Sequence, residues 1–324
     1  MNLTHRIEGP ESVDTVENLK VTTTVTNTGD GTLKLLNDPL SPLSQLPANT
    51  FKITGGAKNA SPSFKGIKAK FVPSVAATQK AYTVLAPGES VDVEHNLSTT
   101  YDFTDAGEGA YSFEANNLFY AVDDSAKVTV LKANVEAHTA RVSGTLRVAR
   151  PAVEKRASYN GCSSSEQSGL VSAASAAQSY AASALSYLTS HTSSTTRYVT
   201  WFGTYTSSRH STVQSHFSSI SSNTFSSFTY DCTCTDSGTY AYVYPDDFGH
   251  IYLCGAFWAA PNTGTDSRGG TLIHESSHFT VNGGTDDHVY GQSACKSLAI
   301  SDPNSAIDNA DSHEYFAENN PAQS

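Results

Sequence analysis

The segment from Thr271 to Gly291, TLIHESSHFTVNGGTDDHVYG, constrains this chain more than any other part of its sequence. His274 and His278 are four residues apart, so on a helix their imidazoles lie on one face and can bind the same metal ion. Glu275 stands between them. HExxH on a helix is typical of zinc peptidases, in which the histidines bind Zn²⁺ and the glutamate is the general base for a water molecule. We therefore expect a catalytic metal site here.

A catalytic zinc site needs a third protein ligand besides the two histidines. The sequence Asn282-Gly283-Gly284 ends the predicted helix, and a turn there can bring the next side chains back to the metal. The metzincin pattern is not met, because Val281 and Gly284 hold its Gly and His positions. The remaining candidates are Asp286, Asp287 and His288, or a glutamate on a later helix, Glu314 or Glu318.

The segment HESSH followed by GTDDHVYG resembles the HExxH plus GTxDxxYG pattern of the deuterolysin-like aspzincins. More specifically, residues 158–324 resemble the fungal peptidyl-Lys metalloendopeptidases, in YNGCSSSEQS, RYVTWFG, DCTCT, YLCGAFW, GTDS and HEYFAENNPAQ. The resemblance implies a mainly helical α+β domain of the zincin type. It also implies one Zn²⁺, held by His274, His278 and Asp287, and cleavage on the amino-terminal side of lysine, with lysine at P1′.

The same resemblance gives roles to three further residues. Tyr290 is expected beside the metal, where it either donates a hydrogen bond to the developing oxyanion or supports the site from behind. Asp311 and Glu314 are three residues apart and share a helix face. In the family the matching pair forms the S1′ pocket, and two partly buried carboxylates would favour the compact lysine ammonium. A solvated acidic face is the alternative for this pair.

The chain changes character near residue 157, which indicates two domains. After that residue the only basic residues are Arg197, Arg209, Arg268 and Lys296, so nearly all of the chain's net charge of −11 falls in this second part. A protein that cuts at lysine gains from having almost none in its own protease domain, although a habitat at low pH would favour the same surface. We expect a domain at 1–133, a linker at 134–157 and a metalloprotease domain at 158–324.

Residues 1–133 are predicted to form an all-β sandwich of the immunoglobulin type. Leu19, Val21, Thr23 and Val25 alternate before a Gly-rich turn, and similar short strands recur at 51–54, 91–93 and 128–130. This region is either a pro-domain that covers the cleft or assists folding, or an adhesion or binding module. The adjacent protease and an intervening processing signal favour a pro-domain.

That signal is the dibasic pair Lys155-Arg156, at which secretory processing proteases cut; a solvated pair of charges is the alternative. The first residues, MNLTHRIEG, lack the apolar stretch of a signal peptide. We expect a secreted, extracellular zymogen whose signal peptide has been removed.

All the cysteines lie after residue 157. Cys232 and Cys234 share one face of an extended segment and are poorly placed to pair with each other, so each needs a distant partner. The resemblance implies that Cys162 pairs with Cys232 and Cys234 with Cys254. A zinc cluster is the rival interpretation, and Cys295 remains as a buried, inert thiol.

The protease domain is expected to open with a helix. Ser163 and Glu166 have the spacing of a capping box, and the apolar positions that follow form a core-facing stripe, at Leu170, Ala174, Ala177, Ala181, Ala184 and Leu188. Residues 240–244 and 251–254 are predicted to form an antiparallel pair. A strand beside the zinc helix can form the edge of the cleft, where an extended substrate pairs with it.

The expected partners are lysine-containing protein and peptide substrates and the chain's own pro-domain. We expect a monomer that binds neither nucleic acid nor membranes. Two other functions stay open. One is a deuterolysin-type peptidase of broader specificity, and the other is a non-catalytic secreted sandwich protein with a structural metal site.

Overall fold

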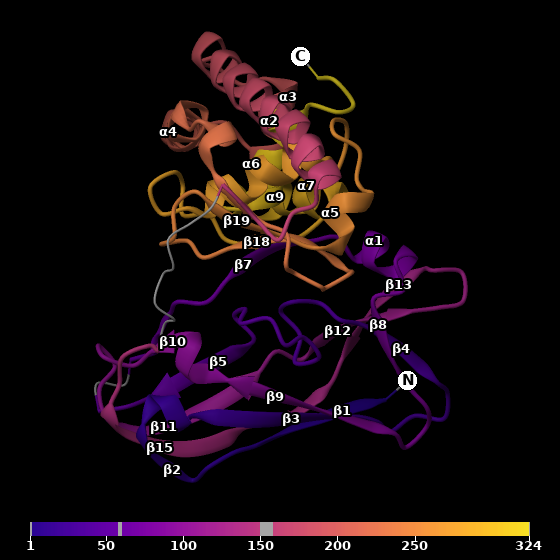
Figure 1. Cartoon of the computed structure of the whole chain (residues 1–324), viewed down its shortest axis with the longest axis vertical. Coiled ribbons are helices and arrows are strands. Elements are labelled where there is room, and N and C mark those ends of the chain that lie inside the picture. Colours follow the sequence, from indigo (N-terminus) through magenta and orange to yellow (C-terminus); the bar gives the residue numbers. More distant parts are fainter. Residues whose placement is uncertain (1, 58–59, 150–157, 324) are drawn as a thin grey trace. The chain divides into compact units, whose positions relative to one another are not determined.

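The computed structural model describes residues 2–57, 60–149 and 158–323, and the chain divides into two compact units (Figure 1). The first unit comprises Met1–Ile67 and Pro73–Glu154, and the second comprises Lys68–Val72 and Lys155–Ser324. The short segment Lys68–Val72 therefore belongs to the second unit, although it comes from the N-terminal half of the chain. The Lys155-Arg156 pair lies outside the described residues.

The first unit is built from β-sheets, and the predicted sandwich is confirmed. Strand β3 buries every second residue, as its alternating sequence predicts, because successive side chains point to opposite faces of a sheet. Three sheets have four strands each, in the orders β14-β1-β3-β9, β2-β15-β11-β5 and β13-β12-β4-β8. Residues from the first two sheets, such as Val21, Phe113 and Val142, share one apolar core.

The elements of this unit have the following bounds: β1 Leu3–Glu8, β2 Ser12–Thr15, β3 Lys20–Asn27, β4 Leu33–Leu36, β5 Phe51–Gly55, β6 Ser63–Phe64, helix α1 Pro73–Thr78, β8 Tyr82–Leu85, β9 Ser90–Asn96, β10 Tyr101–Asp102, β11 Gly109–Ala115, β12 Leu118–Val122, β13 Val128–Lys132, β14 Asn134–Glu136 and β15 His138–Thr145. Strands β6 and β10 form a separate pair. Strands β14 and β15 fall in the segment that the sequence analysis assigned to the linker. Their pairing with β1, β2 and β11 places residues 134–145 in the sheets of the first unit.

The second unit contains one five-stranded sheet, in the order β16-β17-β19-β18-β7. Its strands are β7 Lys68–Phe71, β16 Tyr159–Asn160, β17 Thr229–Asp231, β18 Thr239–Val243 and β19 His250–Leu253. Strands β18 and β19 form the predicted antiparallel pair. Strand β7 runs antiparallel along the free side of β18, at the edge of the sheet (Figure 1).

The helices of the second unit are α2 Ser164–Ser190, α3 Thr196–Phe202, α4 Ser207–Ser222, α5 Gly255–Ala259, α6 Arg268–His278, α7 Gln292–Ser301, α8 Pro303–Ala306 and α9 Ala310–Glu318. The predicted capping box of Ser163 and Glu166 starts α2, and the whole predicted apolar stripe of that helix is buried. No helix within the described ranges is long and apolar enough to cross a bilayer.

Helices α2, α6 and α9 pack against one another and hold the candidate metal ligands in place (Figure 1). The contact between α2 and α6 depends on Gly269, because a Cβ there would lie 2.8 Å from the Cβ of Ala176. A Cβ at Gly270 would meet the carboxylates of Glu314 and Glu318 on α9. These two glycines therefore let α6 approach both neighbouring helices.

Two identical substitutions test this close approach. Gly→Ala inside a helix normally stabilises by up to about 1 kcal/mol. We expect Gly169→Ala in α2 to be neutral or stabilising, because its new Cβ meets only the end of the Arg268 side chain, at 3.0 Å. Gly269→Ala should instead destabilise by about 1–3 kcal/mol through overpacking. Urea unfolding of both variants measures the difference, and equal effects would contradict this account of the helix contact.

Candidate active site

Helix α6 carries the HExxH residues, and its local sequence explains both of its ends. Ser267 caps the first turn by accepting a hydrogen bond from the Gly270 amide, 2.9 Å away. The helix ends at His278, and the turn through Asn282 is fixed by its side-chain amide, which donates to the Ser276 carbonyl. His274, Glu275 and His278 are all fully buried. The turn then returns the chain toward the two histidines, as predicted.

Asp287 is the residue that the turn brings to the histidines. Its Oδ1 atom lies 3.1 Å from Nε2 of His274 and 3.4 Å from Nε2 of His278. These three buried atoms have no hydrogen-bond partner in the described structure. Ligand atoms of a tetrahedral zinc ion lie about 3.4 Å apart, since each is about 2.0–2.2 Å from the metal. The donor set and its spacing therefore fit one divalent ion.

Polar contacts behind the histidines turn both Nε2 atoms toward the same point. Nδ1 of His278 donates to the Thr285 carbonyl, 2.8 Å away. Nδ1 of His274 lies 2.8 Å from Oδ1 of Asp311. Such outer partners hold the proton on Nδ1, so that Nε2 presents its lone pair to a metal.

The charges around the site favour a cation. Burial alone would lower the pKa of His274, but Asp287, Asp311 and Glu314 raise it well above its usual range. Burial alone would raise the pKa of Asp287, yet His278 and His274 lower it far below its usual range. The pKa of His278 is lowered, chiefly by burial, so this imidazole is in the neutral form that binds metals.

Glu275 is placed to handle protons. Its Oε1 atom accepts the backbone N–H of Lys70, at 3.0 Å, and its Oε2 atom has no partner among the described residues. Burial raises the pKa of Glu275 to about 8. A carboxylate with a pKa near neutrality can both accept and return a proton, as a general base requires.

A peptide bond of this chain lies against these groups. The Lys70 amide donates to Glu275, and the Ala69 carbonyl accepts a hydrogen bond from the Tyr290 hydroxyl, at 2.9 Å. The Ala69 amide donates to Oδ2 of Asp287, at 3.1 Å. Tyr290 therefore faces a peptide carbonyl, which is where the sequence analysis expected an oxyanion donor.

The side chain of Lys70 fills a pocket of buried carboxylates. Its Nζ lies 2.7 Å from Oε2 of Glu314 and 3.6 Å from Oδ1 of Asp311, and all three side chains are fully buried. Nζ also donates to Oδ1 of Asp266, at 3.1 Å. Burial alone would lower the pKa of Lys70, but these carboxylates raise it well above its usual range. The rings of Tyr240 and Tyr315 lie beside the ammonium, which is therefore held charged.

Asp311 and Glu314 do not form a solvated face, because every residue of α9 is buried. The two carboxylates also differ in role. Oδ1 of Asp311 lies closer to His274 than to Lys70, and its Oδ2 accepts the Gly291 amide at 2.7 Å. Asp311 thus links the metal ligands to the pocket, whereas Glu314 is nearer to the lysine ammonium.

Asp266 is the pocket residue that sequence reasoning missed. It belongs to the GTDS segment of the family resemblance, but its spacing to α9 gave no sign of a shared site. Asp266 has a φ of 51°, in the left-handed region, and its Oδ1 also accepts the Tyr315 hydroxyl at 2.6 Å. The sequence feature that could have revealed Asp266 was therefore an acidic residue in a turn just before the N-cap of α6.

The other candidates for the third ligand have different partners. Asp286 pairs with Lys68, and His288 lies 2.9 Å from Asp308. Glu318 accepts hydrogen bonds from the backbone and hydroxyl of Ser267 at the start of α6. These contacts do not bring the other candidates to the two histidines, and Asp287 is the candidate whose position fits a third ligand.

Two disulfides join Cys162 to Cys232 and Cys234 to Cys254, the pairing that the resemblance implies. The cysteines of this unit therefore form no zinc cluster among the described residues. Cys295 is free and buried, and burial raises its pKa well above the usual range, which keeps the thiol protonated.

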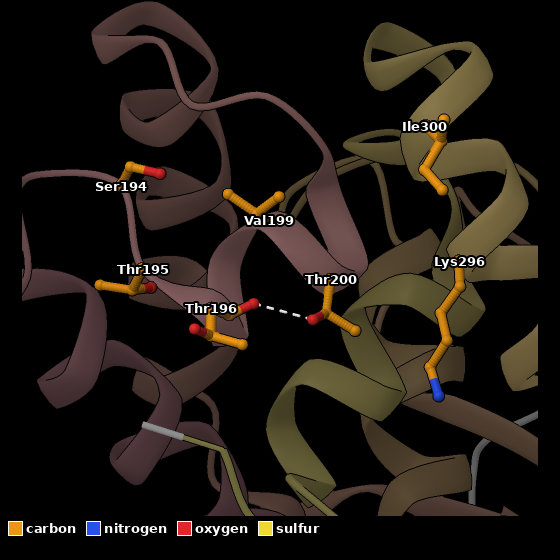
Figure 2. Close-up of a pocket in the computed structure, with 7 residues that line it drawn as sticks. All are labelled: Ser194, Thr195, Thr196, Val199, Thr200, Lys296 and Ile300. Atoms are coloured by element: carbon orange, nitrogen blue, oxygen red, sulfur yellow. Dashed lines mark hydrogen bonds between the residues drawn. The ribbon is translucent and has the colours of Figure 1, made fainter.

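A second pocket lies between α3 and α7 and does not look catalytic (Figure 2). It is lined by Ser194, Thr195, Thr196, Val199, Thr200, Lys296 and Ile300. Figure 2 shows the Thr200 hydroxyl directed at the backbone of Thr196, to which it donates at 2.8 Å. The one ionisable side chain in this lining, Lys296, lies 3.3 Å from Oε1 of Gln292. The pocket thus lacks the paired acids, bases and ligands of the first site.

Comparisons with known proteins agree with this geometry. A family model described as "Lysine-specific metallo-endopeptidase" matches residues 187–318. The chain is 59% identical to a peptidyl-Lys metalloendopeptidase of Grifola frondosa, over 99% of this chain and 94% of that protein. It is 36% identical to an extracellular protease of Aeromonas hydrophila, over 95% and 90% of the two chains. A solved zinc peptidase from Grifola frondosa, at 69% identity, covers 50% of this chain and 100% of its own, with a TM-score of 0.50.

The ligand set makes a prediction about metal content. Loss of a residue that only hydrogen-bonds to a metal ligand weakens metal binding about 10–100-fold. Asp287→Asn changes a proposed ligand itself, so we expect it to weaken metal binding by more than this. His288→Ala, the matched control in the next position, should keep a full equivalent of metal. Elemental analysis after gel filtration measures the metal content of both variants. Metal loss from the His288 variant alone would contradict the assignment of Asp287 as a ligand.

Proposed function

Because the chain belongs to the lysine-specific metallo-endopeptidase family, we propose that it is a zinc endopeptidase that hydrolyses the peptide bond on the amino-terminal side of lysine. One observation carries the proposal. The ammonium of Lys70 occupies the carboxylate pocket, while the peptide bond before Lys70 lies between Tyr290 and Glu275. A bound lysine at this position therefore presents its preceding bond to the base.

His274, His278 and Asp287 would hold the ion, and we propose one Zn²⁺ per protease domain. When bound, Zn²⁺ supplies Lewis acidity that activates water and polarises the substrate carbonyl. Three protein ligands would leave one coordination position open, as catalytic zinc sites require and structural sites do not. This number of ligands opposes the alternative of a structural metal site.

Glu275 takes the proton of the attacking water and returns it to the leaving nitrogen. Its contact with the Lys70 amide supports the second part of this role, because that nitrogen corresponds to the leaving group of a substrate. The Tyr290 hydroxyl donates to the oxygen that becomes negative in the transition state, where hydrogen bonds strengthen most.

Lysine specificity comes from Glu314, Asp266 and Asp311. Buried carboxylates need a cation, and an uncharged side chain would leave them unpaired at a cost of about 3–5 kcal/mol. This cost opposes the alternative of a broadly specific peptidase of the deuterolysin type.

The N-terminal unit is proposed to be the pro-domain of a secreted zymogen, removed after Arg156. Disulfides persist in oxidising compartments, which supports secretion. We further propose that the mature enzyme acts as a monomer on protein and peptide substrates, without nucleic acid or membrane partners.

The substitution Glu275→Gln tests the base. It should lower kcat by at least about 10²–10⁴-fold, the usual contribution of a general base, while the metal content stays at one equivalent. The assay uses a quenched peptide with one lysine, and a chelator-treated wild-type sample shows the background. Retained activity with bound metal would refute the role of Glu275.

The substitution Glu314→Gln tests the pocket. We expect kcat/KM on a lysine peptide to fall by the equivalent of about 2–5 kcal/mol, because a buried charge pair loses one partner. The matched peptide with norleucine in place of lysine should be cut no more slowly by the variant than by the wild type. Glu166→Gln, at a half-buried position in the first turn of α2, is the control. An equal loss on both peptides would assign Glu314 to general stability of the site.

A further inference from the structure

The segment Lys68–Val72 holds one particular peptide bond at the candidate catalytic groups. Hydrolysis of the Ala69–Lys70 bond changes the charge on two atoms, the carbonyl oxygen of Ala69 and the amide nitrogen of Lys70. The Ala69 oxygen accepts from Tyr290, and the Lys70 nitrogen donates to Glu275. The lysine side chain lies in its pocket at the same time. Three contacts expected of a bound substrate are therefore present around this bond.

The direction of the segment agrees with this interpretation. Strand β7 pairs antiparallel with β18, with Ala69 opposite Tyr242 and Lys70 opposite Ala241. A shift of one residue along β18 would send the Lys70 side chain to the other face of the sheet. The observed register combines the filled pocket with a peptide bond at Glu275.

Contacts on both sides fix that register. Before the bond, Nζ of Lys68 donates to the carbonyls of Thr285, at 2.6 Å, and Gly284, at 3.3 Å. After the bond, the ring of Phe71 is fully buried and packs edge-on against Tyr290. A segment that merely filled the cleft would need no such alignment of one bond.

We propose that the Ala69–Lys70 bond is a processing site that the protein cleaves in its own chain, an inference that rests on the proposed function. In this step one water is consumed and the C–N bond between Ala69 and Lys70 breaks. The water oxygen remains on the Ala69 carbonyl carbon as part of a carboxylate, and the Lys70 nitrogen becomes a free amine. Until this bond is cut, Lys70 excludes the lysine of any other substrate from the pocket.

The experiment follows the intact full-length chain after zinc is added to a metal-free preparation. Mass spectrometry of new N-termini should show a fragment that begins at Lys70 before fragments that begin at exposed lysines such as Lys52 or Lys132. The rate should not depend on protein concentration, because bond and site lie in one chain. Lys70→Ala should abolish this fragment, whereas the control Lys52→Ala should keep it. Early cleavage at the exposed lysines without a Lys70 fragment would overturn the proposal.

A second measurement needs neither activity nor a substitution at Lys70. In metal-free Glu275→Gln protein, an amine-reactive reagent should label Lys70 on the order of 100-fold more slowly than Lys52, because its amine reacts only when the segment opens. Equal labelling would overturn the proposal. If the wild-type enzyme cuts an added lysine peptide but never produces the Lys70 fragment, this inference fails and the proposed function stands. If the wild-type enzyme cuts neither the added peptide nor its own chain, the proposed function fails. Slow labelling of Lys70 would in that case still show that the segment is held in the cleft.

Discussion

Buried carboxylates need positive charge close by, and the structure of the protease unit is arranged around this need. Glu275, Asp311 and Glu314 are fully buried, and the Asp287 side chain is only 7% exposed. Removing ionised carboxylates from water costs several kcal/mol each unless cations compensate. The proposed Zn²⁺ supplies one positive centre, and a lysine ammonium supplies the other. Asp311 faces both, since it contacts His274 and lies near Lys70.

The fold brings these groups together through close helix packing. Gly269 and Gly270 allow α6 to lie against α2 and α9, so that the HExxH residues and the α9 carboxylates meet inside the unit. The sheet adds strand β18, along which an extended chain can lie, as the edge strand β7 does. A lysine substrate is thus bound through its backbone on one side and through its charge on the other.

Local patterns made much of this architecture predictable from the sequence. The capping box and the apolar stripe predicted α2, and the alternation of Val21, Thr23 and Val25 predicted β3. The strand character of residues 134–145 was missed, because their pairing partners lie far away in the chain. Asp266 and Lys70 were missed for the same reason, since only tertiary packing brings a turn, an inserted strand and α9 to one pocket. The spacing of a motif predicts which side chains share one face of a single element. It does not predict which residues of a distant element contact that face.

The central claim is that one site combines a metal-dependent base with a lysine pocket. The most direct test is mass spectrometry of a denatured, lysine-rich protein digested by the processed C-terminal domain, with and without a chelator. The account predicts that the new peptides begin with lysine and disappear when the chelator is present. Peptides with mixed N-terminal residues, or lysine-initiated peptides that persist in chelator, would contradict it.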